Sequence, residues 1–260
     1  MSHSPGASRE LEPPKASASS LAPDARRRAH GSLAQEVDAL ARKVDWDAVL
    51  PRRAGRRPWR AQQVVKRAFD VLLAGVALVA LSPLFAVIAL AVILDSRGPV
   101  FYPWVVVGYR GRRFTGYKFR TMVPDADDRK AELLHLNEMS GPVFKMREDP
   151  RVTRVGRFLR KFSLDELPEL WSVVRGDMSL VGPRPLGWEE FANCSPDERQ
   201  KLSLRPGITC LWQASGRSHI SDFREWVRLD KEYIRHWNLW LDLRILAKTM
   251  VVVVRGTGAY

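Results

Sequence analysis

The chain has 260 residues, of which 45% are hydrophobic, and a formal net charge of +13 at neutral pH. This length accommodates one ordinary domain with appendages but hardly two full domains. The positive charge favours anionic partners such as phospholipid head groups, phosphorylated substrates or nucleic acid. Two cysteines are too few for a disulfide framework, and the five histidines show no zinc-site spacing. The composition therefore excludes a disulfide-stabilised secreted domain and indicates a reducing cytoplasmic setting.

Residues 1–60 are predicted to form a disordered basic tail that contains one short helix. The first 31 residues are rich in Ser, Pro, Ala and Arg, so they bury too little apolar surface to offset the entropy of ordering. The short helix is indicated by apolar residues at helical spacing, namely Leu33, Val37, Leu40, Ala41 and Val44. Residues 51–60, with five arginines, follow as a basic linker. Because the first apolar run begins far from the N-terminus, no signal peptide is expected.

Residues 64–96 form the predicted membrane segment. Residues 68–94 are apolar apart from Asp70 and Ser82, and one helix of this length would reach about 40 Å, against a hydrocarbon core of about 30 Å. One interpretation is a single tilted transmembrane helix. The other is a re-entrant hairpin, because Ser82 and Pro83 break the helix at its midpoint and each half, roughly 20 Å long, is too short to cross. Basic residues flank both ends and place both in the cytoplasm, but hydropathy leaves the two interpretations equally favoured.

Residues 97–260 are predicted to form a cytoplasmic domain of mixed short strands and helices. Residues 105–107 and 114–122 resemble strands around a turn, and 124–138 has helical periodicity. Residues 223–254 form a long helical region with a break near Asn238. Its aromatic residues suit either a helix in the head-group layer or a buried core, and they are Trp226, Tyr233, Trp237 and Trp240. The predicted fold class is therefore α+β and mostly helical.

Two adjacent carboxylates, Asp165 and Glu166, lie among basic residues. One interpretation is purely structural: Ser163 is the N-cap of a helix over 164–174, Glu166 completes a capping box, and Asp165 answers the helix dipole. The other is chemical, because a carboxylate is a nucleophile toward phosphorus once cations neutralise the incoming phosphate. In that case Asp165 attacks, and Glu166 holds a Mg²⁺ that bridges a diphosphate.

Four cationic residues are candidates for binding substrate phosphates. Lys118 and Arg120 alternate on a predicted strand and so share one face. Arg160 and Arg184 add guanidinium donors that suit phosphate oxygens. The chain thus combines a carboxylate pair, cations and a membrane segment.

These segments closely resemble the bacterial sugar transferases of the monotopic phosphoglycosyl transferase superfamily. The resemblance is carried by residues 117–122 (Tyr-Lys-Phe-Arg-Thr-Met), 158–161 (Phe-Leu-Arg-Lys), 163–168 (Ser-Leu-Asp-Glu-Leu-Pro) and 176–185, which end in Pro-Arg-Pro. Residues 201–213 and 242–260 resemble the exopolysaccharide-initiating branch. The resemblance covers residues from about 64 to 260.

This resemblance implies an enzyme that transfers a sugar-1-phosphate from a UDP-sugar to undecaprenyl phosphate, releasing UMP, at the cytoplasmic face of the bacterial plasma membrane. It implies a re-entrant helix broken at Ser82 and Pro83, Mg²⁺ as cofactor, Asp165 as nucleophile and Glu166 as its acidic partner and metal ligand. Lys118, Arg120, Arg160 and Arg184 fall in phosphate-handling segments. Glucose and galactose are the commonest sugars of the branch, and no residue decides between them. Membrane lipid is an expected partner, nucleic acid is not, and a homo-oligomer is left open.

One stretch departs from the family's pattern. Residues 102–107 read Tyr-Pro-Trp-Val-Val-Val, where relatives carry arginines. The second half reaction is therefore predicted to be weakened, and arginine at Pro103 and Val106 to restore it. The alternative function is a catalytically inactive relative that acts as a membrane-tethered binding protein for anionic ligands.

Overall fold

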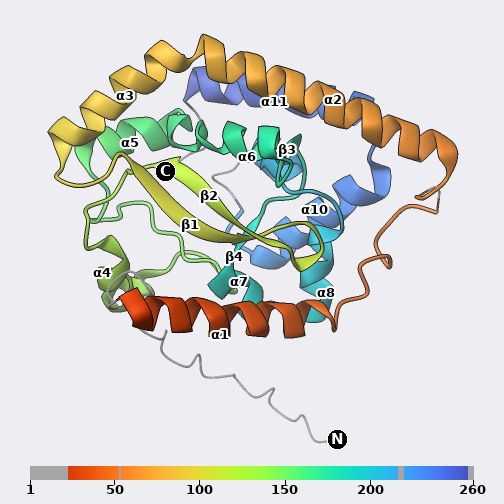
Figure 1. The fold of residues 1–260 in the computed structure, drawn as a ribbon, viewed down its shortest axis with the longest axis horizontal. Coiled ribbons are helices and arrows are strands. Elements are labelled where there is room, and N and C mark those ends of the chain that lie inside the picture. The colour runs from red at the N-terminus through yellow and green to blue at the C-terminus, as the bar shows by residue number, and fades with distance from the viewer. Residues whose placement is uncertain (1–22, 53, 216–219, 257–260) are drawn as a thin grey trace, which may run out of the picture.

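The computed structural model describes residues 23–52, 54–215 and 220–256, in which short helices surround two small sheets (Figure 1). The mostly helical α+β prediction is confirmed. The α-helices are α1 (Pro23–Ala41), α2 (Arg57–Ala80), α3 (Ser82–Asp95), α4 (Ala126–Leu133), α5 (Arg154–Lys161), α6 (Glu169–Arg175), α7 (Trp188–Asn193), α8 (Pro196–Arg199), α9 (Leu211–Ala214), α10 (Phe223–His236) and α11 (Leu239–Arg255). The 3₁₀ helices are η1 (Tyr109–Gly111), η2 (Leu134–Leu136), η3 (Leu164–Glu166) and η4 (Gln200–Ser203). The strands are β1 (Phe101–Val107), β2 (Arg113–Phe119), β3 (Ser179–Val181), β4 (Leu186–Gly187) and β5 (Gly207–Thr209).

Helices α2 and α3 form a bent apolar pair along one side of the molecule (Figure 1). They meet at Leu81 with a bend of 61°. Pro83 lies in the first turn of α3, and the Ser82 hydroxyl donates to the Val79 carbonyl oxygen at 2.7 Å. Within the described ranges no single helix is long and apolar enough to cross a membrane, but this bent pair has the length and composition to do so. The predicted break is confirmed, and the geometry is consistent with a re-entrant helix.

The bent pair exposes apolar side chains that the rest of the described chain leaves uncovered. These are Val64, Val65, Leu72, Val76, Val79, Val87, Leu90, Ile93 and Leu94. Helix α11 runs beside α2 (Figure 1), and the Lys66 ammonium is 2.6 Å from the Asp242 carboxylate. Helix α11 also exposes apolar residues, among them Trp240, Met250 and Val254. Helices α2 and α11 therefore lie side by side and are connected by the ion pair of Lys66 and Asp242.

A β-hairpin lies at the centre of the fold and carries part of the predicted phosphate-binding site. Strands β1 and β2 pair antiparallel from Phe101 opposite Phe119 to Val107 opposite Arg113. Helix η1 forms the turn between them, which confirms the two predicted strands and their connection. Strand β4 adds to the other edge of β1, and β3 pairs with β5 in parallel in a separate sheet.

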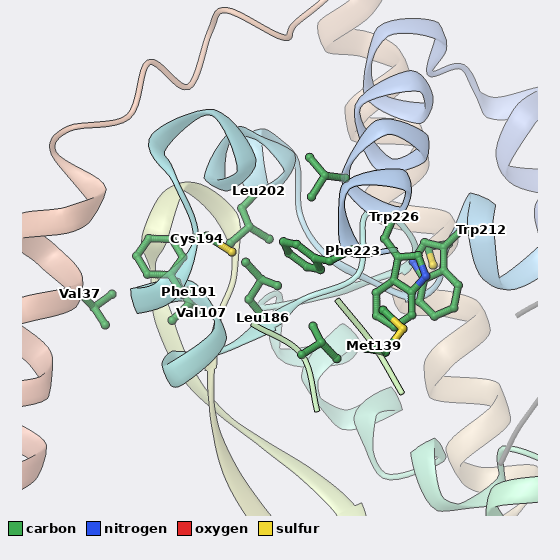
Figure 2. Close-up of a cluster of buried hydrophobic side chains, with 13 residues drawn as sticks. Val37, Val107, Met139, Leu186, Phe191, Cys194, Leu202, Trp212, Phe223 and Trp226 are labelled. Carbon is green, nitrogen blue, oxygen red and sulfur yellow. The ribbon is translucent and has the colours of Figure 1, made fainter. Parts of the chain in front are cut away.

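The first core cluster joins helices from distant parts of the chain (Figure 2). It comprises Val37, Val107, Met139, Val143, Leu186, Phe191, Cys194, Leu202, Cys210, Trp212, Phe223, Trp226 and Val227. Trp212 from α9 and Trp226 from α10 stack with ring centroids 4.1 Å apart and planes within 6°. Burial of this cluster fixes α7, α9 and α10 against the hairpin.

The second core cluster lies under α2 and α11 and contains Leu170, Val173, Met178, Tyr233, Ile234, Trp237 and Ile245. Three of the four aromatic residues considered earlier are therefore core, since Trp226, Tyr233 and Trp237 are at most 2% exposed. Trp240 is 67% exposed on α11. The predicted break near Asn238 is also confirmed, because the Asn238 side chain caps α11 by accepting from the Leu241 amide.

The N-terminal region packs against the domain more than the sequence predicts. Helix α1 begins at Pro23, whereas disorder is predicted as far as Gly31. Val37 is fully buried in the first core cluster, and Val49 lies in the second. The Trp46 carbonyl accepts a hydrogen bond from the Ser203 hydroxyl. Apolar burial at helical spacing offsets the ordering entropy here, and residues 1–22 of the predicted tail lie outside the described residues.

Candidate active site

The two carboxylates Asp165 and Glu166 lie in η3, the short turn between α5 and α6. Ser163, just before it, has a left-handed backbone with φ 54°, a conformation that non-glycine residues adopt rarely and often at functional sites. An N-cap residue is extended instead, and α6 begins only at Glu169. The predicted capping box is therefore wrong.

The Glu166 side chain pairs with Lys118 of β2. Its Oε1 lies 2.9 Å from the Lys118 Nζ, and the Oε1 of Glu169 lies 3.4 Å from the same nitrogen. One ammonium thus serves two carboxylates. Burial alone would lower the pKa of Lys118, but the nearby carboxylates of Glu166, Glu169 and Asp165 raise it overall. Lys118 is therefore a fixed positive charge beside the carboxylate pair, and it also lies 5.2 Å from the centre of the Trp104 ring.

Glu169 is a site residue that sequence analysis missed. It is 2% exposed, and burial raises its pKa to about 7 although Lys118 opposes the shift. The spacing of Asp165 and Glu169 was an available signal, because residues four apart lie on the same side of a helical turn. The missing information was the position of Lys118, which only the docking of β2 supplies.

Arg160 extends from α5 toward the carboxylates. Its Nε donates to the Thr121 hydroxyl at 3.0 Å. Burial lowers its pKa, while Asp165 and Asp149 act in the opposite direction. The Asp165 carboxylate therefore lies in the field of Arg160, as the sequence predicts for a cation that neutralises incoming charge.

Arg120 lies elsewhere. Strand β2 ends at Phe119, and the Arg120 guanidinium donates to backbone carbonyls at the end of α3 and just after it, including Ser96 at 2.7 Å and Gly98 at 3.3 Å. A cation at the carboxyl end of a helix is stabilised by the exposed carbonyls and the helix dipole. Arg120 thus supports the end of the bent helix pair, and its described hydrogen bonds do not bring it to Glu166.

Arg184 lies in the Pro-Arg-Pro loop between β3 and β4. Among the described residues no carboxylate forms an ion pair with its guanidinium, and its buried Nε has no hydrogen-bond partner there. Burial alone would lower the pKa of Arg184, but carboxylates including Glu190 and Glu166 raise it overall. An unpaired guanidinium near acidic residues is suited to bind an anionic ligand that brings its own oxygens.

The chemistry of the donors bears on Mg²⁺. In the described part of the chain no group of three or more His, Cys, Asp or Glu side chains could hold a metal ion by itself. Mg²⁺ usually takes one or two carboxylates, and substrate phosphates and water complete its shell. Asp165 and Glu166 supply that number of carboxylates, so the residues fit a metal bound together with a diphosphate and do not fit a metal cage of protein atoms.

The structure of residues 102–107 bears on the expectation that arginines there would restore the second half reaction. Val106 is fully buried and lies opposite Gly187 of β4, so an arginine there would place an unpaired charge in the core. Pro103 is exposed, but strand alternation places it on the face opposite Trp104. An arginine at Val106 is therefore expected to destabilise the fold, and the predicted restoration of the second half reaction stays a prediction.

The site can support nucleophilic chemistry on a phosphorylated substrate. Asp165 offers a carboxylate oxygen, Lys118 and Arg160 surround it with positive charge, and Arg184 has donors to spare. Such an arrangement lowers the repulsion between a carboxylate and a diphosphate.

Comparison with known proteins agrees with this geometry. Galactosyl transferase CpsE of Streptococcus agalactiae is 43% identical over 75% of this chain and 43% of its own length. Undecaprenyl-phosphate galactose phosphotransferase of Salmonella typhimurium is 42% identical over 77% of this chain and 43% of its own. Exopolysaccharide production protein ExoY of Rhizobium meliloti is 42% identical over 76% of this chain and 88% of its own. The chain thus spans less than half of the first two relatives. The model of the family described as bacterial sugar transferase matches residues 61–256, so the chain belongs to the bacterial sugar transferase family.

Proposed function

We propose that this protein transfers a sugar-1-phosphate from a UDP-sugar to undecaprenyl phosphate and releases UMP, as the first membrane step of exopolysaccharide or capsule synthesis. The observation that carries the proposal is the pair Asp165 and Glu166 in a turn surrounded by Lys118, Arg160 and Arg184. The names of the relatives, which include an undecaprenyl-phosphate galactose phosphotransferase and a UDP-galactose-lipid carrier transferase, support the substrate classes.

In the first half reaction, an Asp165 carboxylate oxygen attacks the sugar-proximal phosphorus of the UDP-sugar. A bond forms between that oxygen and phosphorus, the bond from phosphorus to the bridging oxygen breaks, and UMP leaves with the electron pair. Lys118 and Arg160 stabilise the charge that builds up on the phosphoryl oxygens. The product is a phosphosugar-aspartyl intermediate.

In the second half reaction, a phosphate oxygen of undecaprenyl phosphate attacks the same phosphorus. The bond from phosphorus to the Asp165 oxygen breaks, and the carboxylate returns to its starting state with the electron pair. The sugar is left on the lipid through a diphosphate. Two sequential displacements predict ping-pong kinetics.

Glu166 and Asp165 are the residues that would hold Mg²⁺ in this proposal. Bound there, the metal would supply charge neutralisation on the diphosphate. Glu166 is oriented by its contact with Lys118 at 2.9 Å, which keeps its carboxylate beside Asp165 without further reorganisation.

We place the bent pair of α2 and α3 in the cytoplasmic leaflet as a re-entrant helix, with both of its ends in the cytoplasm. The 61° bend at Leu81 and the exposed apolar side chains support this placement. Single cysteines introduced at Arg60 and Arg113 should both react with an impermeant thiol reagent only from the cytoplasmic side. Labelling from opposite sides would instead identify a spanning helix.

The experiment that tests the function is UMP release by the purified full chain with a panel of UDP-sugars, UDP-glucose and UDP-galactose first, with and without undecaprenyl phosphate. Turnover that requires both substrates and yields a lipid-linked sugar supports the proposal. A membrane-tethered binding protein without catalysis would bind UDP-sugars saturably and release no UMP from any of them.

A further inference from the structure

Arg184 is held by its surroundings although its guanidinium has no carboxylate partner within the described ranges. Its guanidinium carbon lies 5.9 Å from the ring centroid of Trp212 and 5.9 Å from that of Trp226. The flanking residues Pro183 and Pro185 have fixed φ angles, which restricts the loop backbone. Both distances lie within the roughly 6 Å range of cation–π contacts, and because the two rings stack on each other the guanidinium lies beside the stack and faces at most one of them.

The two indole rings are held rigidly against each other. Trp212 and Trp226 lie against each other (Figure 2). Their ring centroids are 4.1 Å apart and their planes are within 6°. They are 3% and 2% exposed, and they come from α9 and α10, which the first core cluster fixes. Neither indole N–H has a hydrogen-bond partner among the described residues. Burial in the first core cluster accounts for the two rings, and their position next to Arg184 gives them a second contact.

The backbone of Arg184 is anchored as well. Its amide donates to the Asp230 Oδ2 at 3.3 Å, and the same oxygen lies 2.7 Å from the Lys201 ammonium. Both side chains of this ion pair are fully buried. The loop is thus joined to α10, the helix that also carries Trp226.

Contact with aromatic rings has a specific consequence for a guanidinium. A carboxylate partner would use up two of its N–H donors, whereas an aromatic contact leaves the donors at its edge free. The described part of the chain gives Arg184 no such carboxylate partner. The contacts with the two rings therefore orient the guanidinium and also leave its N–H donors free.

We propose that Trp212 and Trp226 are positioning residues that hold the Arg184 guanidinium, with its donors free, for the diphosphate of the nucleotide sugar. This inference rests on the proposed function, because it assigns the anion to that substrate. It predicts that the two indoles contribute to diphosphate binding only through Arg184.

A double-mutant cycle tests this coupling. UDP is the probe, and its Kd is measured by calorimetry on the full chain in detergent, for Trp212→Phe and Trp226→Phe in the wild-type and Arg184→Gln backgrounds. Because a cation–π contact is weakened and shifted by the smaller ring, each Phe variant should bind UDP about tenfold more weakly when Arg184 is present. In the Arg184→Gln background the same substitutions should change Kd by less than about twofold, since non-additivity reports residues that act together.

Trp59→Phe is the matched control, because Trp59 packs against Trp237 in the second core cluster and its indole N–H is likewise without a hydrogen-bond partner among the described residues. It should leave Kd unchanged in both backgrounds. Equal losses in the two backgrounds, or no loss in either, would overturn the inference. The proposed function is tested separately by UMP release from the wild type. If the wild type releases UMP but the effects in the cycle are additive, only the positioning role is rejected. If the effects are coupled but no UMP is released, the positioning role holds for a diphosphate ligand and the proposed enzymatic function is rejected.

Discussion

Two clusters of charged side chains in this molecule, one buried and one mostly half-buried, differ in how their charges are paired. The first, here called the fastening network, joins α2, α10 and α11 through Lys66, Asp70, Ser179, Tyr233, Trp237 and Asp242. The second, here called the catalytic cluster, contains Lys118, Arg160, Asp165, Glu166, Glu169 and Arg184. Both are enclosed by helices, and they differ in how completely their charges are satisfied.

In the fastening network each carboxylate has several protein partners. Asp242 lies 2.6 Å from the Lys66 ammonium and accepts from the Tyr233 hydroxyl at 2.7 Å and the Trp237 indole at 3.2 Å. Asp70 accepts from the Ser179 hydroxyl at 2.8 Å. A network satisfied in this way rigidifies a fold. Its role is to fix the apolar helix α2 on the catalytic domain.

In the catalytic cluster two cations are not matched one to one with carboxylates of the described residues. Lys118 is divided between Glu166 and Glu169, and the Arg184 guanidinium has no carboxylate partner within the described ranges. A half-buried charge without a partner is costly, and under the proposed function the anionic substrate supplies that partner. The comparison teaches that completeness of pairing, more than burial or charge, separates the functional cluster from the structural one.

The largest expected effect comes from Asp165→Asn. The substitution keeps the shape and removes the nucleophile, so UMP release should fall by about 10⁴-fold or more. Asp125→Asn, in an exposed ion pair with Arg129, is the control and should keep full activity. Substantial turnover by Asp165→Asn, measured as UMP released per folded enzyme, would contradict the assignment.

Arg184→Gln should lower kcat/KM by about 10² to 10³-fold, the usual loss when one charge-stabilising donor is removed. Its thermal stability should stay the same or rise, because the substitution removes a half-buried cation that has no carboxylate partner among the described residues. This opposite movement of activity and stability distinguishes a ligand-binding cation from a structural one. A matched Arg224→Gln variant on the exposed side of α10 should change neither quantity, and a joint fall of both in Arg184→Gln would place Arg184 in the structural class.

Lys66→Met tests the other side of the comparison. It leaves Asp70 and Asp242 buried without their cation, so the free energy of unfolding should fall by about 3 to 5 kcal/mol. The kcat of the molecules that remain folded should be unchanged. Chemical unfolding in detergent, with the exposed Lys248→Met of α11 as control, measures the effect. A large loss of kcat at unchanged stability would assign Lys66 to catalysis.

The smallest effect concerns Glu169 and pH. Burial raises its pKa from an ordinary 4.5 to about 7, so between pH 4.5 and 7 the folded chain binds more protons than the unfolded chain. The contribution of Glu169 to the free energy of unfolding is therefore largest below pH 4.5 and is lost as the pH rises to 7, by about 1.4 kcal/mol for each unit of pKa difference. Glu169→Gln should remove this part of the pH dependence. Its free energy of unfolding should therefore rise relative to that of the wild type as the pH increases across that window. If the free energies of unfolding of the wild type and of Glu169→Gln differ by the same amount at every pH in this window, the pKa of Glu169 is not shifted.

The sequence predicts well the features that depend on local pattern. The bend next to Ser82 and Pro83, the strands around the turn before Arg113 and the helix start at Asn238 all follow from backbone chemistry within a few residues. The site prediction likewise places Lys118, Arg160 and Glu166 in one neighbourhood, as the contacts and electrostatic effects indicate.

The failures are tertiary. A capping box is predicted for Ser163 and Glu166, but the docked β2 strand provides Lys118 as the stronger partner for Glu166. Strand alternation is predicted to bring Arg120 to the site, but β2 ends one residue earlier and the carbonyl groups at the end of α3 hold its guanidinium. The tail before α2 is ordered in part by burial of Val37. No local pattern contains these long-range partners.

The most direct test of the central claim, that the Asp165 carboxylate is the nucleophile, is mass spectrometry of the purified full chain after incubation with UDP-sugar and Mg²⁺ in the absence of undecaprenyl phosphate. The account predicts one phosphosugar added to the peptide that contains Asp165, and its loss when undecaprenyl phosphate is supplied. An adduct on a different residue, or turnover with lipid in an enzyme that never carries an adduct, would contradict it.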